Sequence, residues 1–283
     1  MPELPEVETV RRGLEPHLTG ARLVRVVQNR PDLRFPLPTH FIERLTGARV
    51  ERLDRRAKYL LAPLDTGETL VAHLGMTGRF TIESQMPGDF HHAAGADPKH
   101  THVVLHTESG TTVSYNDARR FGFMDLIATT ALTGHPWFAS MGPEPLGPGF
   151  NTAQLAGALK GRKQSIKVLL LDQRTVAGLG NIYVCEALNR AGVDPRKEGG
   201  QISRARLAVL VDVIREVLAE AVEAGGSTLR DYRSADGALG YFQHRFRVYG
   251  REEAPCPRQG CSGVIQRIVQ GGRSTFFCPR CQR

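Results

Sequence analysis

Long apolar runs are missing from this 283-residue sequence, in which no stretch reaches the length that spans a membrane. Its acidic N-terminus lacks the pattern of a secretory signal peptide, and no internal repeat is evident. These absences argue against an integral membrane protein, a secreted protein and a repeat architecture. We therefore expect a soluble, cytoplasmic protein whose reduced thiols are available to bind metal.

An excess of positive charge is missing from the first half of the chain. Residues 1–150 carry 16 basic and 17 acidic side chains, a net charge of −1, whereas residues 151–283 carry 21 and 12, a net charge of +9. The length suits two domains rather than one. The uneven charge predicts a polyanionic partner that is bound mainly by the C-terminal half.

The most reactive chemistry is expected in the first nine residues, MPELPEVET. Removal of Met1 leaves Pro2 as the first residue, with a secondary amine that is a nucleophile of pKa about 8. When such an amine attacks a sugar C1′, it forms an iminium that stays cationic without a proton. Because that cation is an electron sink, a terminal proline suits a reaction in which a base leaves and the strand is then cut by elimination.

A helix is expected a few residues after this amine. Pro5 suits its first turn, and one face carries apolar side chains at spacings of three and four, namely Val7, Val10, Leu14 and Leu18. The positive end of the helix would lower the pKa of the amine and favour anionic Glu3 and Glu6. Glu3 is then placed as a general acid/base. A capped amphipathic helix with ordinary first-turn acids accounts for this stretch equally well.

The rest of the first half has the pattern of β structure. Short apolar segments separated by turn residues recur at 22–27, 49–64, 69–82, 102–106, 111–115 and 121–128. We expect a β-sandwich with the first helix packed at its edge. Residues 85–100, which are polar and rich in Gly, Pro and His, are interpreted as a mobile insertion.

Two glycine-bounded turns in this half each carry one large apolar side chain. Met76 lies between Gly75 and Gly78, and Phe121 precedes Gly122. Such side chains usually pack against the protein core. In a protein that binds DNA, they can instead act as wedges that unstack neighbouring base pairs. The sequence leaves both interpretations open.

The second half changes to helical periodicity after a Pro- and Gly-rich segment at 134–150, which we interpret as a linker. Helices are expected at 154–160, at 165–173, up to about residue 190 and at 203–224. A glycine turn before Asn181 can present backbone N–H groups and this side chain to a phosphate, although many helical hairpins share the pattern. Residues 227–243 contain few apolar side chains and are expected to form a flexible loop.

Four of the five cysteines form the strongest single motif. Four residues separate Cys256 from Cys261 and two separate Cys278 from Cys281, with sixteen residues of hairpin character between the pairs. This spacing predicts a zinc ribbon that holds one structural Zn²⁺. Two disulfides are the alternative, which an intracellular chain disfavours. Cys185 falls inside a helix and is interpreted as a buried thiol.

Six motifs occur in order along the chain: residues 1–9, Arg56-Ala57-Lys58, His73-Leu74-Gly75-Met76, Arg119-Arg120-Phe121-Gly122, Gly180-Asn181-Ile182-Tyr183 and the four-cysteine ribbon. Together they closely resemble bacterial formamidopyrimidine-DNA glycosylases from end to end. The resemblance implies a two-domain α+β protein. Its N-terminal part would be a β-sandwich with an N-terminal helix, and its C-terminal part a helix–two-turns–helix (H2TH) domain with a four-cysteine zinc ribbon.

We place the domain boundaries on this basis. Residues 1–133 form the β-sandwich catalytic domain and residues 134–150 the linker. Residues 151–244 form the helical DNA-binding domain, including a loop at 227–243 that resembles the lesion-capping loop of the family. Residues 245–283 form the zinc-finger ribbon.

For the reaction, the resemblance implies a bifunctional enzyme that removes 8-oxoguanine and formamidopyrimidines and then cleaves the abasic strand by β,δ-elimination. Pro2 would form the Schiff base, with Glu3 as the proton donor that assists sugar opening. Lys58 would contact the phosphate near the lesion and support β-elimination, and both Lys58 and Arg273 are expected to donate protons. Glu6 would lie at the damaged-base pocket.

For DNA binding, the resemblance assigns three residues to phosphates: His73, Asn181 and Arg273. Three others, here called the wedge residues, would fill the space left by the flipped base: Met76, Arg119 and Phe121. Of these, Arg119 would face the orphaned cytosine. The implied partner is damaged double-stranded DNA, bound by a monomer that contacts no membrane and is associated with the nucleoid.

Three features depart from the family pattern. The first cysteine pair is separated by four residues where the family usually has two, which puts the geometry of that knuckle in doubt. Ala118 replaces the usual proline before Arg119, which predicts a looser turn. The insertion at 85–100 has no role that can be transferred from the family.

Two other functions fit part of the pattern. A non-catalytic zinc-ribbon protein that binds bent or damaged DNA would not need Pro2, Glu3 and Lys58 together. An oxidised-pyrimidine glycosylase of the endonuclease VIII type would share the N-terminal nucleophile. Leu4 and the wedge residues favour the purine enzyme.

Overall fold

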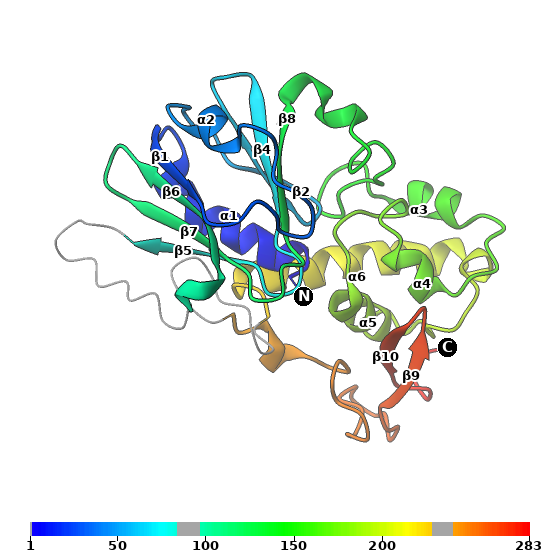
Figure 1. Ribbon diagram of the computed structural model, residues 1–283. Coiled ribbons are helices and arrows are strands. Elements are labelled where there is room, and N and C mark those ends of the chain that lie inside the picture. The colour runs from blue at the N-terminus through cyan, green and yellow to red at the C-terminus, as the bar shows by residue number, and fades with distance from the viewer. Residues whose placement is uncertain (1, 84–96, 228–239) are drawn as a thin grey trace. The chain divides into compact units, whose positions relative to one another are not determined.

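The computed structural model describes residues 2–83, 97–227 and 240–283 (Figure 1). The chain divides into two compact units. The first comprises Met1–Ala139 and Ala224–Gln243, and the second comprises Ser140–Glu223 and His244–Arg283. Among the described residues, no helix combines the length and the apolar character that crossing a membrane requires.

The first unit contains two antiparallel four-stranded sheets. In order, one sheet consists of β1 (Leu23–Gln28), β6 (Thr101–Thr107), β7 (Thr112–Asn116) and β5 (Arg79–Glu83). The other consists of β2 (Asp54–Arg56), β3 (Tyr59–Pro63), β4 (Glu68–His73) and β8 (Phe123–Ala128). The predicted β-sandwich is confirmed, and the strand system expected at 69–82 is divided between the two sheets.

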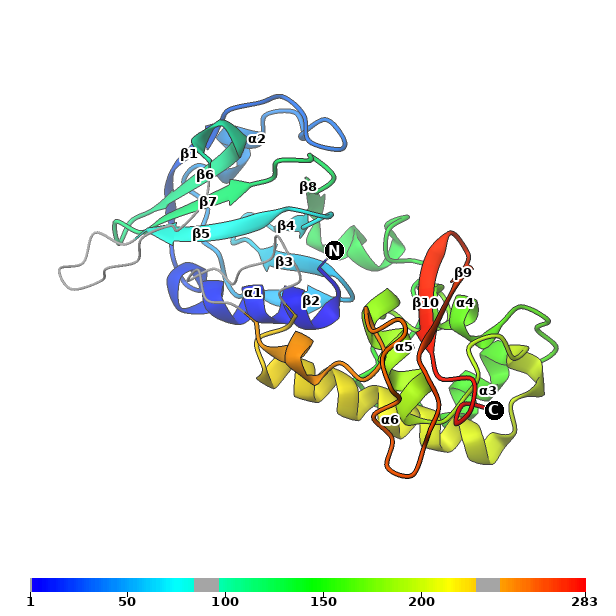
Figure 2. The same cartoon turned by 90° about the horizontal axis from the view of Figure 1, so that it is seen from below.

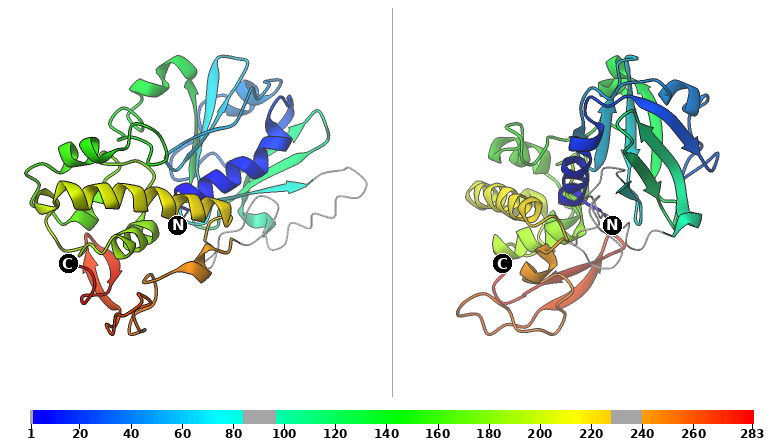
Figure 3. Two further views of the ribbon diagram at one scale, coloured as in Figure 1. Left: turned by 180° about the vertical axis from the view of Figure 1, so that it is seen from behind. Right: turned by 90° about the vertical axis from the view of Figure 1, so that its left-hand side faces the viewer.

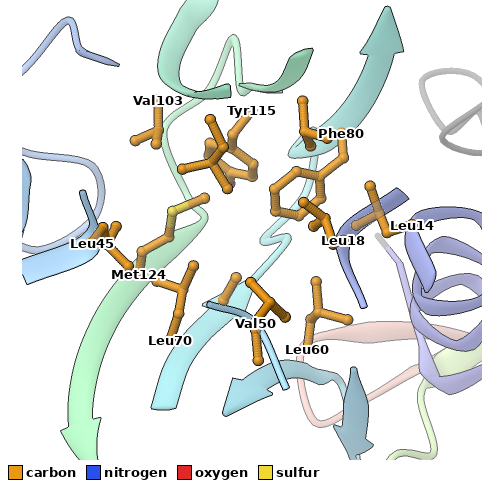
Figure 4. Packing of buried hydrophobic residues seen from close by; sticks show 14 of the residues in the cluster. Leu14, Leu18, Leu45, Val50, Leu60, Leu70, Phe80, Val103, Tyr115 and Met124 are labelled. Atoms are coloured by element: carbon orange, nitrogen blue, oxygen red, sulfur yellow. The ribbon is translucent and has the colours of Figure 1, made fainter. Parts of the chain in front are cut away.

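The core of this unit is formed by side chains from both sheets and from α1 (Leu4–Leu18). Buried and more exposed positions alternate along β3 and β7, because successive side chains of a strand point to opposite faces. Figure 4 shows the resulting cluster, in which Leu14 of α1 lies with Leu60, Phe80, Tyr115 and Met124.

Helix α1 packs along β2 and β3 (Figure 2). Pro5 occupies its first turn, and the four apolar side chains predicted for its inner face are all buried. Burying each such side chain contributes roughly 1.5–3 kcal/mol. The apolar face therefore holds the N-terminal end of the helix firmly on the sandwich.

Two connecting segments run side by side from one sheet of the sandwich to the other. Residues 74–78 lead from β4 to β5, and residues 117–122 lead from β7 to β8. Because β4 pairs with β8 in one sheet and β5 pairs with β7 in the other, both connections cross at the same side of the sandwich. The topology thus brings together Met76 and Phe121, which are far apart in sequence.

The second unit is helical, as predicted, and ends in a two-stranded ribbon (Figure 3). Its helices are α3 (Thr152–Leu159), α4 (Ile166–Leu171), α5 (Asn181–Arg190) and α6 (Arg204–Glu223). The ribbon strands are β9 (Gln266–Gln270) and β10 (Arg273–Phe277). Helix α5 packs against both α6 and β10, so the ribbon is built directly onto the helical core.

The short elements of the chain were not predicted. They are α2 (Phe41–Leu45) and the 3-10 turns η1 (Pro98–His100), η2 (Thr129–Gly134), η3 (Gly199–Gln201) and η4 (Phe242–Arg245). A helix of five residues is too short to show a helical period. Instead, α2 is held by tertiary contacts of Phe41 and Leu45, both buried in the core.

Candidate functional site

Residues 2–6 pack within the first unit. Glu3 is the N-cap of α1 and forms a reciprocal capping box with Glu6, whose carboxylate accepts the Glu3 backbone N–H at 2.8 Å. Both Pro2 and Glu3 are buried. The residues predicted to act as nucleophile and acid are therefore held at the positive end of a helix rather than on a frayed terminus.

Glu6 connects this terminus to a distant part of the chain. It is 1% exposed, and its second carboxylate oxygen accepts both the backbone N–H of Ser227 (2.8 Å) and the Ser227 hydroxyl (3.0 Å). A Cβ on Gly226 would lie 3.0 Å from Glu6 Cγ, so the two segments pack closely. No sequence pattern predicts this link, because the two residues are 221 positions apart.

Lys58 lies in the two-residue turn that joins β2 to β3 and is 8% exposed. Its neighbour Ala57 adopts a left-handed conformation with φ of 52°, which lets the chain turn so tightly. An ion pair of 3.2 Å between Arg55 and Glu8 ties this hairpin to α1. Burial raises the pKa of Glu8, but hydrogen bonds from arginines of α1 such as Arg11 hold it below its usual value, so this anchor stays anionic.

His73 ends β4 and lies in a row of aromatic side chains. It pairs across the sheet with Tyr59 on one side and Phe123 on the other. Its Nδ1 accepts the backbone N–H of Gly75 at 3.0 Å. A neutral imidazole in this position carries its proton on Nε2, which makes that nitrogen a donor.

The surroundings of His73 disfavour the charged ring. Burial, followed by the positive charges of Lys58 and Arg34, lowers the pKa of His73 to about 4. The ring is therefore neutral near pH 7. It can donate one hydrogen bond to a phosphate but supplies no charge.

Arg34 was missed by sequence reasoning. It lies between Pro31 and Pro36. Arg34 lines a cavity of about 440 Å³, together with Leu33 and three residues of the 117–122 connection, namely Arg119, Arg120 and Phe121. Its backbone N–H donates to Gly122 O at 3.0 Å, which joins this segment to the same connection. A charged residue in a proline-bounded turn was the available signal.

The wedge residues lie on the two neighbouring connections of the sandwich. Phe121 is 44% exposed, and the Arg119 guanidinium carbon lies 4.7 Å from the centre of its ring. Met76 is half-buried. Gly75 has φ of +60°, and a Cβ there would overlap the backbone of Phe121 and Gly122. The two turns thus touch through their backbones, and their tips remain outside the core.

In the second unit, Asn181 is the first residue of α5 and Arg273 the first residue of β10. The Asn181 side-chain amide donates to Ser274 O at 2.8 Å, so it links α5 to the ribbon. Arg273 is exposed and follows the tight Gly271-Gly272 turn. Both residues were predicted to contact phosphates. Arg273 can do so through its exposed side chain, whereas Asn181 lies at the start of α5, where backbone N–H groups can bind an anion.

The four C-terminal cysteines converge, with their sulfurs within 4.8 Å of one another. The Cys256–Cys281 and Cys261–Cys278 sulfurs are each 3.7 Å apart. Tetrahedral ligation at about 2.3 Å requires separations of roughly 3.8 Å, whereas a disulfide requires about 2.05 Å. The geometry suits one metal ion, and the longer first spacing does not prevent closure.

Buried polar residues attach this ribbon to α5. The side-chain carbonyl of Gln282 accepts hydrogen bonds from the Cys278 backbone N–H (2.8 Å) and from the Asn189 side-chain amide (2.9 Å). The side-chain amide of Gln282 donates to Val193 O (2.9 Å). The fully buried Glu186 accepts backbone N–H groups of residues 247–249. Sequence reasoning identified none of the three buried polar residues Gln282, Asn189 and Glu186.

Comparison with known proteins identifies the family. A model described as "Formamidopyrimidine-DNA glycosylase N-terminal domain" matches residues 1–124, its H2TH counterpart matches 141–233, and "Zinc finger found in FPG and IleRS" matches 254–283. The formamidopyrimidine-DNA glycosylases of Caulobacter vibrioides and Phenylobacterium zucineum are 67% and 62% identical, over 100% of both chains. The chain belongs to the formamidopyrimidine-DNA glycosylase family.

Solved structures of the formamidopyrimidine-DNA glycosylase family agree over the whole chain. MutM (Fpg) from Thermus thermophilus is 43% identical with a TM-score of 0.85, covering 99% of this chain and 98% of the other. Lactococcus lactis Fpg, solved in complex with DNA that contains an abasic site, is 35% identical with a TM-score of 0.88 and covers 100% of both. The predicted two-domain α+β fold is confirmed.

The zinc finger of this chain holds one structural zinc ion, as its four converging cysteines and its family match indicate. Two predictions fall largely outside the described residues. Residues 84–96 contain most of the His-rich insertion, and residues 228–239 contain most of the loop predicted to cap the lesion.

Proposed function

We propose that Pro2 and Glu3 begin the reaction of a base-excision-repair enzyme. The enzyme is a DNA glycosylase with AP lyase activity that removes oxidised purines from damaged duplex DNA, in line with its family. The assignment of Pro2 and Glu3 is supported by their burial at the capped start of α1. The Glu3–Glu6 capping box holds the chain next to the amine that removal of Met1 would free.

The reaction follows from the chemistry of a secondary amine. The Pro2 nitrogen attacks C1′ and loses its proton, the bond between C1′ and the damaged base breaks, and the base leaves with a proton. The C1′–O4′ bond of the resulting aminal then breaks and O4′ takes a proton, which opens the sugar and leaves the iminium between C1′ and the Pro2 nitrogen. The iminium then allows loss of a C2′ proton with departure of the 3′ phosphate, and a second elimination expels the 5′ phosphate. Water hydrolyses the remaining iminium and frees Pro2. Glu3 moves protons at the sugar, and Lys58 and Arg273 supply protons at phosphates.

DNA is held by residues of both units. Lys58, the neutral His73 donor and Arg34 are proposed phosphate contacts of the first unit, and the start of α5 at Asn181 and the exposed Arg273 are those of the second. The wedge residues replace the extruded nucleotide, with Arg119 facing the orphaned cytosine. Glu6 lies near the damaged base, and zinc shapes the ribbon that carries Arg273 without taking part in the chemistry.

The domain division proposed for this enzyme has four parts. Residues 1–133 form the catalytic β-sandwich, 134–150 the linker, 151–244 the H2TH domain and 245–283 the zinc finger. The protein would act as a monomer in the cytoplasm, associated with the nucleoid, as suits a bacterial enzyme that repairs the chromosome.

Borohydride trapping on a duplex with an 8-oxoguanine:cytosine pair tests this function. The protein lacking Met1 should form a covalent complex with DNA, whereas a variant with residues added before Pro2 should bind DNA without being trapped. A non-catalytic DNA-binding protein would give no trapped complex with either. Preferential trapping on an oxidised pyrimidine would instead indicate an activity of the endonuclease VIII type.

A further inference from the structure

Asp117, the first residue of the 117–122 connection, is a fully buried carboxylate that accepts a hydrogen bond from the 74–78 connection. One oxygen accepts the backbone N–H of Gly122 at 2.8 Å and the hydroxyl of Tyr115 at 3.4 Å. The other accepts the Arg119 backbone N–H at 3.3 Å and the Thr77 hydroxyl. Four donors satisfy a charge whose burial would otherwise be costly.

Thr77 supplies the only one of these donors that comes from the other connection. Its hydroxyl oxygen also accepts the Arg119 backbone N–H at 3.1 Å, so it lies between that amide and the Asp117 carboxylate. The two residues are 40 positions apart in sequence. Thr77 directly follows Met76, and Asp117 lies two residues before Arg119. Their hydrogen bond therefore joins the turn that carries Met76 to the turn that carries Arg119 and Phe121.

The other contacts between the turns do not set their relative position as tightly. Gly75 and Gly122 meet without side chains, which permits close approach but supplies no directional bond. Tyr115 remains a donor, because burial and the Asp117 charge raise its pKa well above the usual value. The Thr77 hydroxyl is thus the directional side-chain link between the two turns.

We propose that Thr77 and Asp117 are positioning residues that hold the two turns in one register, so that the wedge residues enter the DNA stack as a unit. This inference rests on the proposed function. Extruding a base costs a few kcal/mol, which inserted side chains must offset. Side chains whose relative position is fixed beforehand lose less entropy on insertion than side chains on independently moving turns.

Substitution of Thr77 separates positioning from folding. Thr77→Val keeps the shape of the side chain and removes its hydroxyl, Thr77→Ala removes the hydroxyl by a second route, and Thr77→Ser retains it. Single-turnover excision of 8-oxoguanine from intact duplex should slow roughly tenfold in the Val and Ala variants, the size of effect expected for one hydrogen bond to a charged group. Thr77→Ser should restore the rate.

Cleavage at a pre-formed abasic site is the matched measurement, because no base has to be extruded there. The Val and Ala variants should cleave this substrate at nearly the wild-type rate and melt within a few degrees of wild type. Equal slowing on both substrates, or excision unaffected by loss of the hydroxyl, would overturn the positioning role. If the wild-type protein itself fails to be trapped on DNA, the proposed function fails instead.

Discussion

The rings of His73 and Phe123 stack across β4 and β8, with 4.9 Å between their centres and 11° between their planes. On the opposite side, Tyr59 lies 5.0 Å from the imidazole, and Gly75 N–H occupies Nδ1. Solvation of an imidazolium is impeded on both faces of the ring. His73, which the resemblance assigns to a phosphate, is therefore a neutral hydrogen-bond donor in the fold.

Replacing His73 with Gln should leave the salt dependence of DNA binding unchanged. The amide still offers an N–H donor, and no charge is lost, so the slope of log Kobs against log salt should stay at the wild-type value. Binding to duplex DNA, measured across a salt series, checks this. Arg273→Gln is the matched control and should flatten the slope by roughly one unit. A comparable flattening in His73→Gln would show that the imidazole is charged in the complex.

The stability of the first unit should fall below pH 6.5 in a way that depends on His73. Its pKa is about 4 in the folded protein and about 6.5 when unfolded. Between these values the unfolded chain binds more protons, so stability is fully present above pH 6.5 and is lost as the pH falls through the folded pKa. The expected slope from this residue is at most about 1.4 kcal/mol per pH unit.

Trp137 makes this loss measurable. It is the single tryptophan of the chain, and its ring centre lies 4.6 Å from that of Phe123, next to His73. Urea unfolding followed by its fluorescence at pH 7 and pH 5 should show a smaller pH effect in His73→Gln than in wild type. The same pH effect in both proteins would assign the loss to other groups.

Removing one zinc ligand should affect the second unit and spare the first. Cys278→Ser should lower the zinc content and the DNA affinity, because metal ligation supplies folding free energy to a ribbon too small for a core of its own. Metal analysis and binding assays test this, while Trp137 fluorescence reports whether the sandwich stays folded. Cys185→Ala, at the one cysteine outside the metal site, should retain the zinc ion. Wild-type protein with paired disulfides and no zinc would contradict the assignment.

Truncating a wedge residue should impair extrusion rather than bond cleavage. Met76→Ala and Phe121→Ala should severely slow excision from intact duplex and largely spare cleavage at a pre-formed abasic site. Arg119→Ala should in addition weaken the preference for cytosine opposite the lesion. Single-turnover rates on the two substrates, measured with each opposite base, decide this.

The alternative for these side chains is core packing. The 44% exposure of Phe121 argues against it. If packing were their role, each substitution would lower the melting temperature and slow both substrates by the same factor. That outcome would remove the wedge from the mechanism.

The sequence by itself determined the elements whose signals are local. Helix α1 follows from Pro5 and from an apolar face with helical spacing, all close together in sequence. The zinc site follows from cysteine spacing, because two ligand pairs joined by a hairpin can close on one ion wherever the ribbon packs. Glu3 and Lys58 could be named because each lies in a short motif.

Only the tertiary structure decided the protonation of His73, the Ser227–Glu6 link and the Thr77–Asp117 bond. Each depends on residues that are distant in sequence. The two connections between the sheets bring Thr77 to Asp117, and the return of residues 224–227 to the first unit brings Ser227 to Glu6. A hydrogen bond of this kind has no period and no fixed spacing in sequence. Its effect on pKa and position arises from burial and direction, which exist only once the chain has folded.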